Sequence, residues 1–375
     1  MLRLDLSVLW PTTELTVGYG PRLSLVRELD GSEPWGANFL HEVDAGFFLR
    51  DARYTLGLTQ SFSYGTQSFA QIFAVPEGIS VAAPGTAPGT SPSALAAAAS
   101  AAAPVTPVPS GTGDLVPLRS VKYLGYSGGA RLTYLFSPRW ESNFNADYSV
   151  SGGRDGDEDL LPRIHTIDVG GAVEHEVTRQ QSVGGVLHSQ RGWSERGDFW
   201  LAELAASWAL RLSVATTLSL RAGLGYRDTG DDGSDTRSHS FSPVGAAGLT
   251  HSVTLPGSRA LFSLVVTYDP AVDVVNATVQ DRITGLASVG WATETDSVTL
   301  AVTGSHGFGS DPNRFLGSSL TYDHRFVDWL GVQLGGQVAD QDAGAPEDSV
   351  QRDFTTGTIW TVFAGVGLTL DPQRF

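Results

Sequence analysis

Charged side chains that recur at alternate positions of extended segments are the residues of this sequence best suited to chemistry. Because every second residue of these segments is apolar, the charges of a segment share its other face. Carboxylates and guanidinium groups around a water-filled space set a field that screens charged solutes, and an acidic excess favours cations. As salt bridges, the same groups would instead stiffen a wall. The candidates for this face are Asp147, Asp168, Glu174, Glu203, Asp323, Arg22, Arg53, Arg131, Arg221, Arg227 and Arg325.

Glycines alternate on the same polar face, as Gly223 and Gly225 do in the segment 216–227. A glycine leaves space where another side chain would project. The pattern therefore fits an open interior, and it equally fits close contact with an inserted loop or a partner.

Nucleophilic catalysis and metal chemistry have little support in the sequence. His175, His306 and His324 fall on the apolar face, and no GxSxG motif is present to mark a nucleophile. The chain has no cysteine, which excludes thiolate metal sites and disulfides. The acidic stretches 154–159 and 228–235 lack the spacing of a calcium loop. We predict no enzyme activity, no metal and no cofactor, and we assign the histidines an interfacial role and the acidic stretches that of solvated loops.

The elements that carry these residues are predicted to be long β-strands. In 218–226 the apolar residues Leu218, Leu220, Ala222, Leu224 and Tyr226 alternate with polar residues and glycines. This period of two is that of a strand with unlike faces, and it recurs along most of the chain. The segments are roughly 9–14 residues long, whereas strands of soluble proteins average about 5–6.

The connections between the predicted strands alternate in length. Tight turns are expected near 9–14, 49–53, 136–140, 177–181, 213–217, 254–259, 292–297 and 326–329. Longer polar loops are expected at 28–37, 74–116, 152–160, 191–198, 228–240, 269–274, 309–314 and 341–353. Short turns on one rim and long loops on the other are typical of membrane barrels. The stretch 74–116 is a low-complexity insertion rich in Ala and Pro.

Several features favour an apolar face that points outward. Charged residues make up 17 % of the chain, against about 25 % in ordinary soluble domains. Aromatic residues collect at strand ends, for example Trp140 and Tyr148, which are spaced to mark the two edges of an apolar band. Only a closed barrel lets strands cross lipid with every backbone group paired. No apolar run reaches the roughly 18 residues that a membrane helix needs.

On these patterns the chain resembles a bacterial outer-membrane β-barrel protein of the porin-like kind. Its end resembles the C-terminal assembly signal of that group, which implies the assembly machinery as a partner. The signal consists of an apolar alternation and a terminal aromatic residue, here Val362, Ala364, Val366, Leu368, Leu370 and Phe375. The segment "DPQRF" after Leu370 departs from the usual pattern, in which the aromatic residue ends the strand itself.

We predict an all-β fold, a single transmembrane antiparallel up-and-down barrel over residues 1–375. Seventeen strands can be counted, while bacterial barrels have even numbers. Either a strand is missing before Met1 together with a signal peptide, giving eighteen, or the first segment is not a full strand, giving sixteen.

The expected location is the outer membrane of a Gram-negative bacterium, with membrane lipid around the barrel. The leading function is a channel for passive or weakly selective passage of small solutes. The alternatives are a structural or anchoring subunit with an occluded lumen and, third, an outer-membrane hydrolase. A net charge of −16 argues against nucleic acid as a partner.

Overall fold

The computed structural model describes residues 2–28, 36–68, 120–158, 162–195, 197–231, 237–273, 278–308, 314–327, 330–342, 357–369 and 373–374. The predicted insertion 74–116 lies outside these residues. Nearly all of the described chain is β-strand. Within it, no helix is long and apolar enough to cross a membrane.

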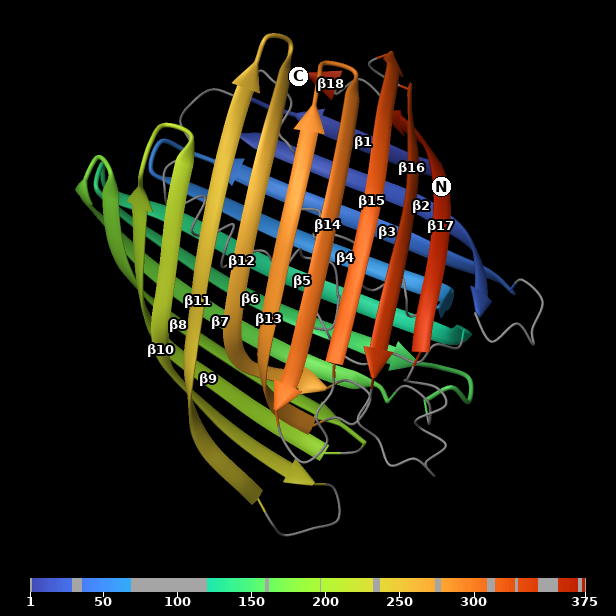
Figure 1. The fold of residues 1–375 in the computed structure, drawn as a ribbon, viewed down its shortest axis with the longest axis horizontal. Coiled ribbons are helices and arrows are strands. Elements are labelled where there is room, and N and C mark those ends of the chain that lie inside the picture. The colour runs from blue at the N-terminus through green and yellow to red at the C-terminus, as the bar shows by residue number, and fades with distance from the viewer. Residues whose placement is uncertain are drawn as a thin grey trace.

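The strands follow one another along the chain (Figure 1). They are β1 (Leu2–Leu9), β2 (Thr13–Glu28), β3 (Gly36–Arg50), β4 (Tyr54–Ser68), β5 (Ser120–Ser137), β6 (Trp140–Gly153), β7 (Ile164–Thr178), β8 (Gln181–Ser194), β9 (Gly197–Arg211), β10 (Thr216–Asp231), β11 (Arg237–Leu255), β12 (Ser258–Asp273), β13 (Thr278–Ala292), β14 (Asp296–Phe308), β15 (Arg314–Val327), β16 (Leu330–Asp342), β17 (Gly357–Thr369) and β18 (Gln373–Arg374).

The wall consists of the sixteen strands β2 to β17, each paired antiparallel with the next along the chain. The pairing returns from β17 to β2 over four positions, from Ile359↔Glu28 to Val362↔Leu25. This is the up-and-down arrangement that the sequence predicts, at the lower end of the expected range of strands.

The first segment is not a full wall strand, which agrees with the sixteen-strand alternative. β1 has eight residues and lies at the seam between β17 and β2. It pairs parallel with β17, from Leu2↔Val366 to Asp5↔Thr369, and antiparallel with β2. The short β18 also pairs with β1. The side chains of 362–370 and of Phe375 lie outside the described residues, so the assembly signal stays a prediction.

Turn lengths follow the predicted alternation on one rim and depart from it on the other. β11 and β12, for example, are joined by residues 256–257, where Gly257 adopts the positive φ of 73° that a tight turn needs. The predicted long loop 191–198 is wrong, because β8 continues to Ser194 and β9 begins at Gly197. The loops 228–240 and 269–274 were also placed too widely, since β10, β11 and β12 all extend into them.

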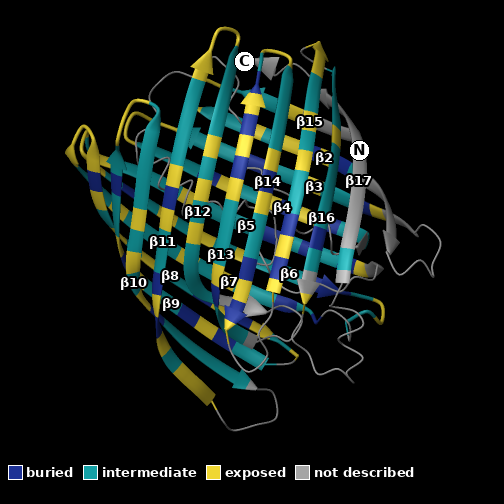
Figure 2. Cartoon of the chain, in the orientation of Figure 1, coloured by how far each residue is buried: buried dark blue, intermediate teal, exposed yellow. Residues whose placement is uncertain are grey.

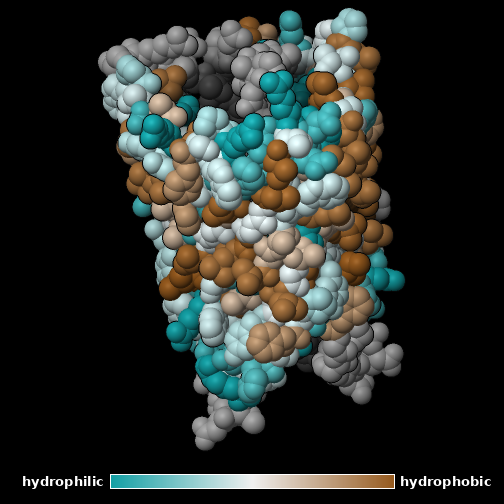
Figure 3. Space-filling model, turned by 90° about the vertical axis from the view of Figure 1, so that its left-hand side faces the viewer, coloured by the Kyte–Doolittle hydropathy of each residue, from teal (hydrophilic) through white to brown (hydrophobic). Residues whose placement is uncertain are grey.

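The two faces of the wall differ as predicted, with the apolar face outward. Leu187, Leu204 and Leu224 have 60 %, 66 % and 64 % of their surface exposed. Ser182 and Gln190 on β8 point the other way and are 3 % and 5 % exposed. Exposed and less exposed residues alternate along strands such as β14 and β15 (Figure 2). Hydrophobic side chains cover much of the outer face in Figure 3. A soluble protein would bury this face, so the wall is built to meet lipid.

The outward face gives a first test of the fold. We expect Leu220→Arg on β10, whose leucine is 41 % exposed, to destabilise the folded barrel by up to about 2–4 kcal/mol, because it places a charge in lipid. The measurement is reversible urea unfolding in lipid vesicles. Ser219→Arg is the matched control, since Ser219 lies on the other face. Equal losses from both substitutions would contradict the assignment of the faces.

Candidate functional site

A continuous polar row crosses the inner face of β6, β7 and β8. Asp147 and Asp168 lie opposite each other in the ladder. The amide nitrogen of Asn145 lies 3.3 Å from Asp147 Oδ2 and 3.1 Å from Asp168 Oδ1, and it donates to both. His188 Nε2 lies 2.5 Å from Asp168 Oδ2. These donors screen two carboxylates that would otherwise repel each other, so the row presents acidic oxygens to the interior in fixed positions.

A second group on β9 and β10 pairs opposite charges. Arg221 Nε lies 3.4 Å from Glu203 Oε1, and their side chains are 17 % and 11 % exposed. Glu203 is the ladder partner of Gly225 and also faces His188 across β8 and β9. The low exposure shields this ion pair from water, which makes its attraction stronger than that of a surface pair.

Charges from β12 and β13 reach the same region from a different part of the wall. Arg227 Nη1 on β10 lies 3.3 Å from Asp281 Oδ1 on β13. Asp269 on β12 interacts electrostatically with Arg221 and Glu203. Arg282, next to Asp281, is only 1 % exposed. Because β11 separates β10 from β12 in the ladder, these contacts show that the ends of β12 and β13 turn inward. Figure 1 shows their lower ends bending away from β11.

The predicted charged residues are only partly gathered in this cluster, which we call the lumen cluster. Its members are Asp147, Asp168, His188, Glu203, Arg221, Arg227, Asp269, Asp281 and Arg282. Arg131 on β5 is exposed and acts on Asp147 through its charge. Glu174 on β7 lies opposite Glu141. Arg53 is not on a strand but in the exposed turn between β3 and β4.

Four members of the cluster are not among the residues that the sequence predicts, namely His188, Asp269, Asp281 and Arg282. The segment 269–274 was assigned to a loop, and nothing in the local pattern connects it to β9 or β10. Pro270 was the available signal, because a proline within a strand marks an edge or a break. The side chain of Arg22, on β2, lies outside the described residues.

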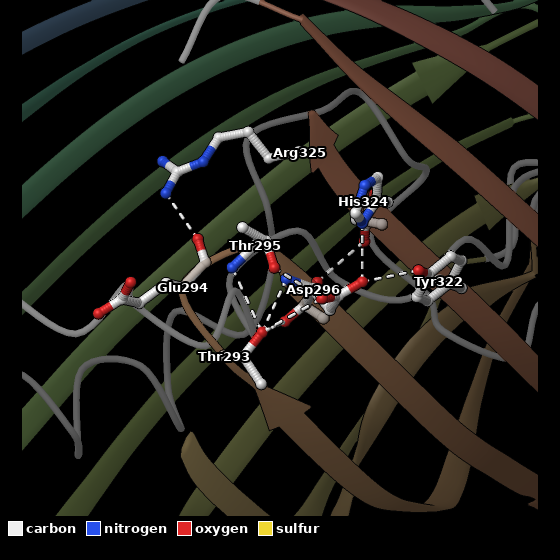
Figure 4. A network of polar contacts seen from close by, with 9 residues as sticks. Thr293, Glu294, Thr295, Asp296, Tyr322, His324 and Arg325 are labelled. Atoms are coloured by element: carbon white, nitrogen blue, oxygen red, sulfur yellow. Dashed lines mark hydrogen bonds and ion pairs between the residues drawn. The ribbon is translucent and has the colours of Figure 1, made fainter. Parts of the chain in front are cut away.

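Asp323 and Arg325 lie near the short-turn rim. A compact network stabilises the β13–β14 turn there (Figure 4). Asp296 Oδ1 accepts hydrogen bonds from Tyr322 Oη at 2.7 Å and from His324 Nδ1 at 2.8 Å. Thr295 Oγ1 donates to Asp296 Oδ2 at 2.7 Å. Arg325 donates to the Glu294 carbonyl at 2.6 Å, and Asp323 accepts from Ser297 Oγ at 3.2 Å. These contacts anchor a turn and do not line the lumen cluster.

The histidines predicted on the apolar face lie among aromatic rings at the two ends of the wall. His175 stacks on Trp140 with ring centroids 4.3 Å apart, and His306 meets Phe308 edge-on at 4.9 Å. Trp140 and Phe308 are 45 % and 44 % exposed. Such amphipathic rings suit a membrane–water interface. The arrangement agrees with the interfacial role that the sequence predicts for the histidines.

The described part of the first acidic stretch, 154–158, is held by hydrogen bonds within the protein. Asp157 Oδ2 accepts from the backbone N–H of Lys122 at 2.7 Å, and Glu158 Oε1 lies 3.3 Å from Arg163. Hydrogen bonds from its own backbone N–H and from that of Gly156 lower the pKa of Glu158. Throughout the described part of the chain, no group of three or more His, Cys, Asp or Glu residues could hold a metal ion.

Comparison with known proteins finds similarity at the level of fold. No protein-family model and no curated protein matches the sequence. The ferric-catecholate import receptor Fiu of E. coli K12 is 9 % identical, with a TM-score of 0.46 over 98 % of this chain and 72 % of its own. The FrpB iron transporter of Neisseria meningitidis (F5-1 variant) is 10 % identical, with a TM-score of 0.49 over 96 % of this chain. The siderophore receptor PiuA of Acinetobacter baumannii is 8 % identical, with a TM-score of 0.45 over 94 % of this chain.

This chain spans only 64 % and 65 % of the FrpB and PiuA chains, so the likeness concerns the arrangement of strands and not an activity. The outward apolar face, the aromatic residues at the ends of the wall and the polar interior decide the class. The chain has the fold of an outer-membrane β-barrel. Its charged residues on the inner face lie on the side of the wall opposite the apolar face.

The network around Asp296 gives a second test. We expect Asp296→Ala to cost about 1–3 kcal/mol of stability, because it leaves Tyr322 and His324 without their acceptor. Urea unfolding in vesicles measures the loss. Tyr322→Phe removes one of these hydrogen bonds and should cost about 1 kcal/mol. A loss for Asp296→Ala no larger than that for Tyr322→Phe would show that the network does not anchor the turn.

Proposed function

We propose that this barrel is a channel for passive or weakly selective passage of small solutes. The observation that carries the proposal is the polar inner face of a sixteen-strand wall, on which Asp147, Asp168 and Glu203 hold fixed charges. Barrels of sixteen to eighteen strands leave room for an aqueous passage, whereas eight-strand barrels are filled by side chains. A wall made only to anchor the chain would need no row of partly exposed charges.

The charges on the inner face favour cations over anions. The lumen cluster has five carboxylates against three guanidinium groups, which are Arg221, Arg227 and Arg282. The whole chain has a net charge of −16. An acidic lumen raises the local concentration of cations and lowers that of anions.

Planar lipid bilayers test this function directly. Wild-type protein in a salt gradient should give single-channel currents whose reversal potential indicates cation preference. Asp147→Asn combined with Asp168→Asn should move that potential toward zero, because two lumen charges are removed. Asp155→Asn is the matched control, since Asp155 lies in the exposed loop after β6. Folded wild-type protein that never conducts would contradict the channel function.

An anchoring or structural function is the second candidate, and one observation favours it. The inward ends of β12 and β13 place Asp269, Asp281 and Arg282 inside the barrel, where they occupy part of the lumen. If this occlusion were complete, solutes could not pass. A sealed bilayer containing folded wild-type protein would favour this alternative over the channel.

A further inference from the structure

The β12–β13 hairpin leaves the wall at a defined position. β11 and β12 pair without interruption from Leu255↔Ser258 to Gly245↔Tyr268, and there their ladder ends. Both strands nevertheless continue. β11 remains paired with β10 as far as Gly230↔Arg237, and β12 remains paired with β13 as far as Asp273↔Thr278. Two intact hairpins therefore separate from each other.

Two prolines explain the separation. Continuing the register of β11 and β12 would place Pro243 opposite Pro270. Proline has no backbone N–H, so this position cannot supply a donor from either strand. The ladders on the other sides pass through both residues, at Leu224↔Pro243 and Pro270↔Asp281. The missing donors of the two prolines therefore face each other across the position where pairing stops.

The released end of the hairpin is seated on the inner surface of β10. A Cβ on Gly225 would stand 2.9 Å from Val244 Cγ1 on β11 and 3.5 and 3.6 Å from two atoms of the Pro270 ring. Gly225 thus leaves room for Val244, and Pro270 lies directly against it. Two residues further along β10, Arg227 Nη1 contacts Asp281 Oδ1 at 3.3 Å, and the two side chains are 28 % and 21 % exposed. We call this ion pair the latch.

We propose that the ends of β12 and β13, released by the facing prolines and held by the Arg227–Asp281 latch, form the constriction that sets what passes through the lumen. The inference rests on the proposed channel function and names its size- and charge-selecting element. Arg282 and Asp269 add to the constriction, because both lie on the inserted segments and in the lumen cluster. β13 stays paired with β14 as far as Asp281↔Phe308, so the constriction is attached to the wall on one side only.

Single substitutions in the latch distinguish a mechanical effect from a purely electrostatic one. Arg227→Gln makes the lumen more negative, and Asp281→Asn makes it less negative. If the latch holds the constriction in place, single-channel conductance should rise in both variants. If the two residues act only as fixed charges, cation preference should change in opposite directions without a common rise in conductance.

The charge swap Arg227→Asp with Asp281→Arg restores an ion pair and keeps the net charge. We expect it to return conductance toward the wild-type value. Arg237→Gln is the control, because it breaks a contact of 2.6 Å with Asp198 and removes the same charge as Arg227→Gln at an exposed site. Its conductance should equal that of wild type. Heat-modifiable migration on gels verifies that each barrel is folded.

The prolines provide an independent variant. Pro243→Thr combined with Pro270→Thr supplies the two missing donors, so β11 and β12 can extend their ladder and draw the hairpin toward the wall. Conductance should rise as it does when the latch is broken. Each single proline substitution restores only one donor and should have a smaller effect.

The possible results separate this inference from the channel function. A conducting wild type whose conductance rises in both single latch variants would support the constriction. A conducting wild type with unchanged latch and proline variants would overturn the constriction and leave the channel function standing. Opposite conductance changes in the two single variants, or a swap that fails to restore wild-type behaviour, would overturn the latch. Folded barrels that never conduct in any variant would overturn the channel function itself.

Discussion

Backbone hydrogen bonding is the constraint on which this structure depends, because lipid offers no partner for an unpaired N–H or C=O. Every strand from β3 to β16 is paired with both its neighbours over much of its length, and the wall returns from β17 to β2. At that seam the direct pairing covers only four positions, and β1 lies against both strands. The short first strand thus supplies backbone partners where β2 and β17 do not pair with each other.

The same wall determines where charge can be placed. Residues such as Leu204 and Leu224 must face lipid, so charges on neighbouring positions point into the lumen. There they pair, as Glu203 and Arg221 do at 3.4 Å. Asp296 is placed differently, because its carboxylate lies at the rim and is satisfied by Tyr322, His324 and Thr295. The alternation of apolar and polar residues therefore places apolar side chains toward lipid and charged side chains on the inner face.

Much of the wall could be predicted from sequence, because a period of two is a local property. It predicts the opposite directions of the Leu220 and Arg221 side chains, the tight turn before β10 and the aromatic residues at strand ends. The ends of the strands at the long-loop rim could not be predicted in the same way. β8 and β9 continue through the expected loop 191–198 because each pairs with the other as far as Ser194↔Gly197, although the alternation there is weak. Arg53 is expected on the polar face, yet it lies in the turn between β3 and β4.

The inserted hairpin shows that the register between strands, and not the composition of a segment, determines which residues lie inside the barrel. Pro243 and Pro270 are separated by a turn and lie on different strands, and each alone is compatible with a strand edge. Only the register from Leu255↔Ser258 to Gly245↔Tyr268 brings them opposite each other. Two missing donors at one position end the ladder between β11 and β12 there. Released there, the hairpin can exchange wall contacts for Gly225 and Arg227, and Asp281 thereby reaches a partner three strands away.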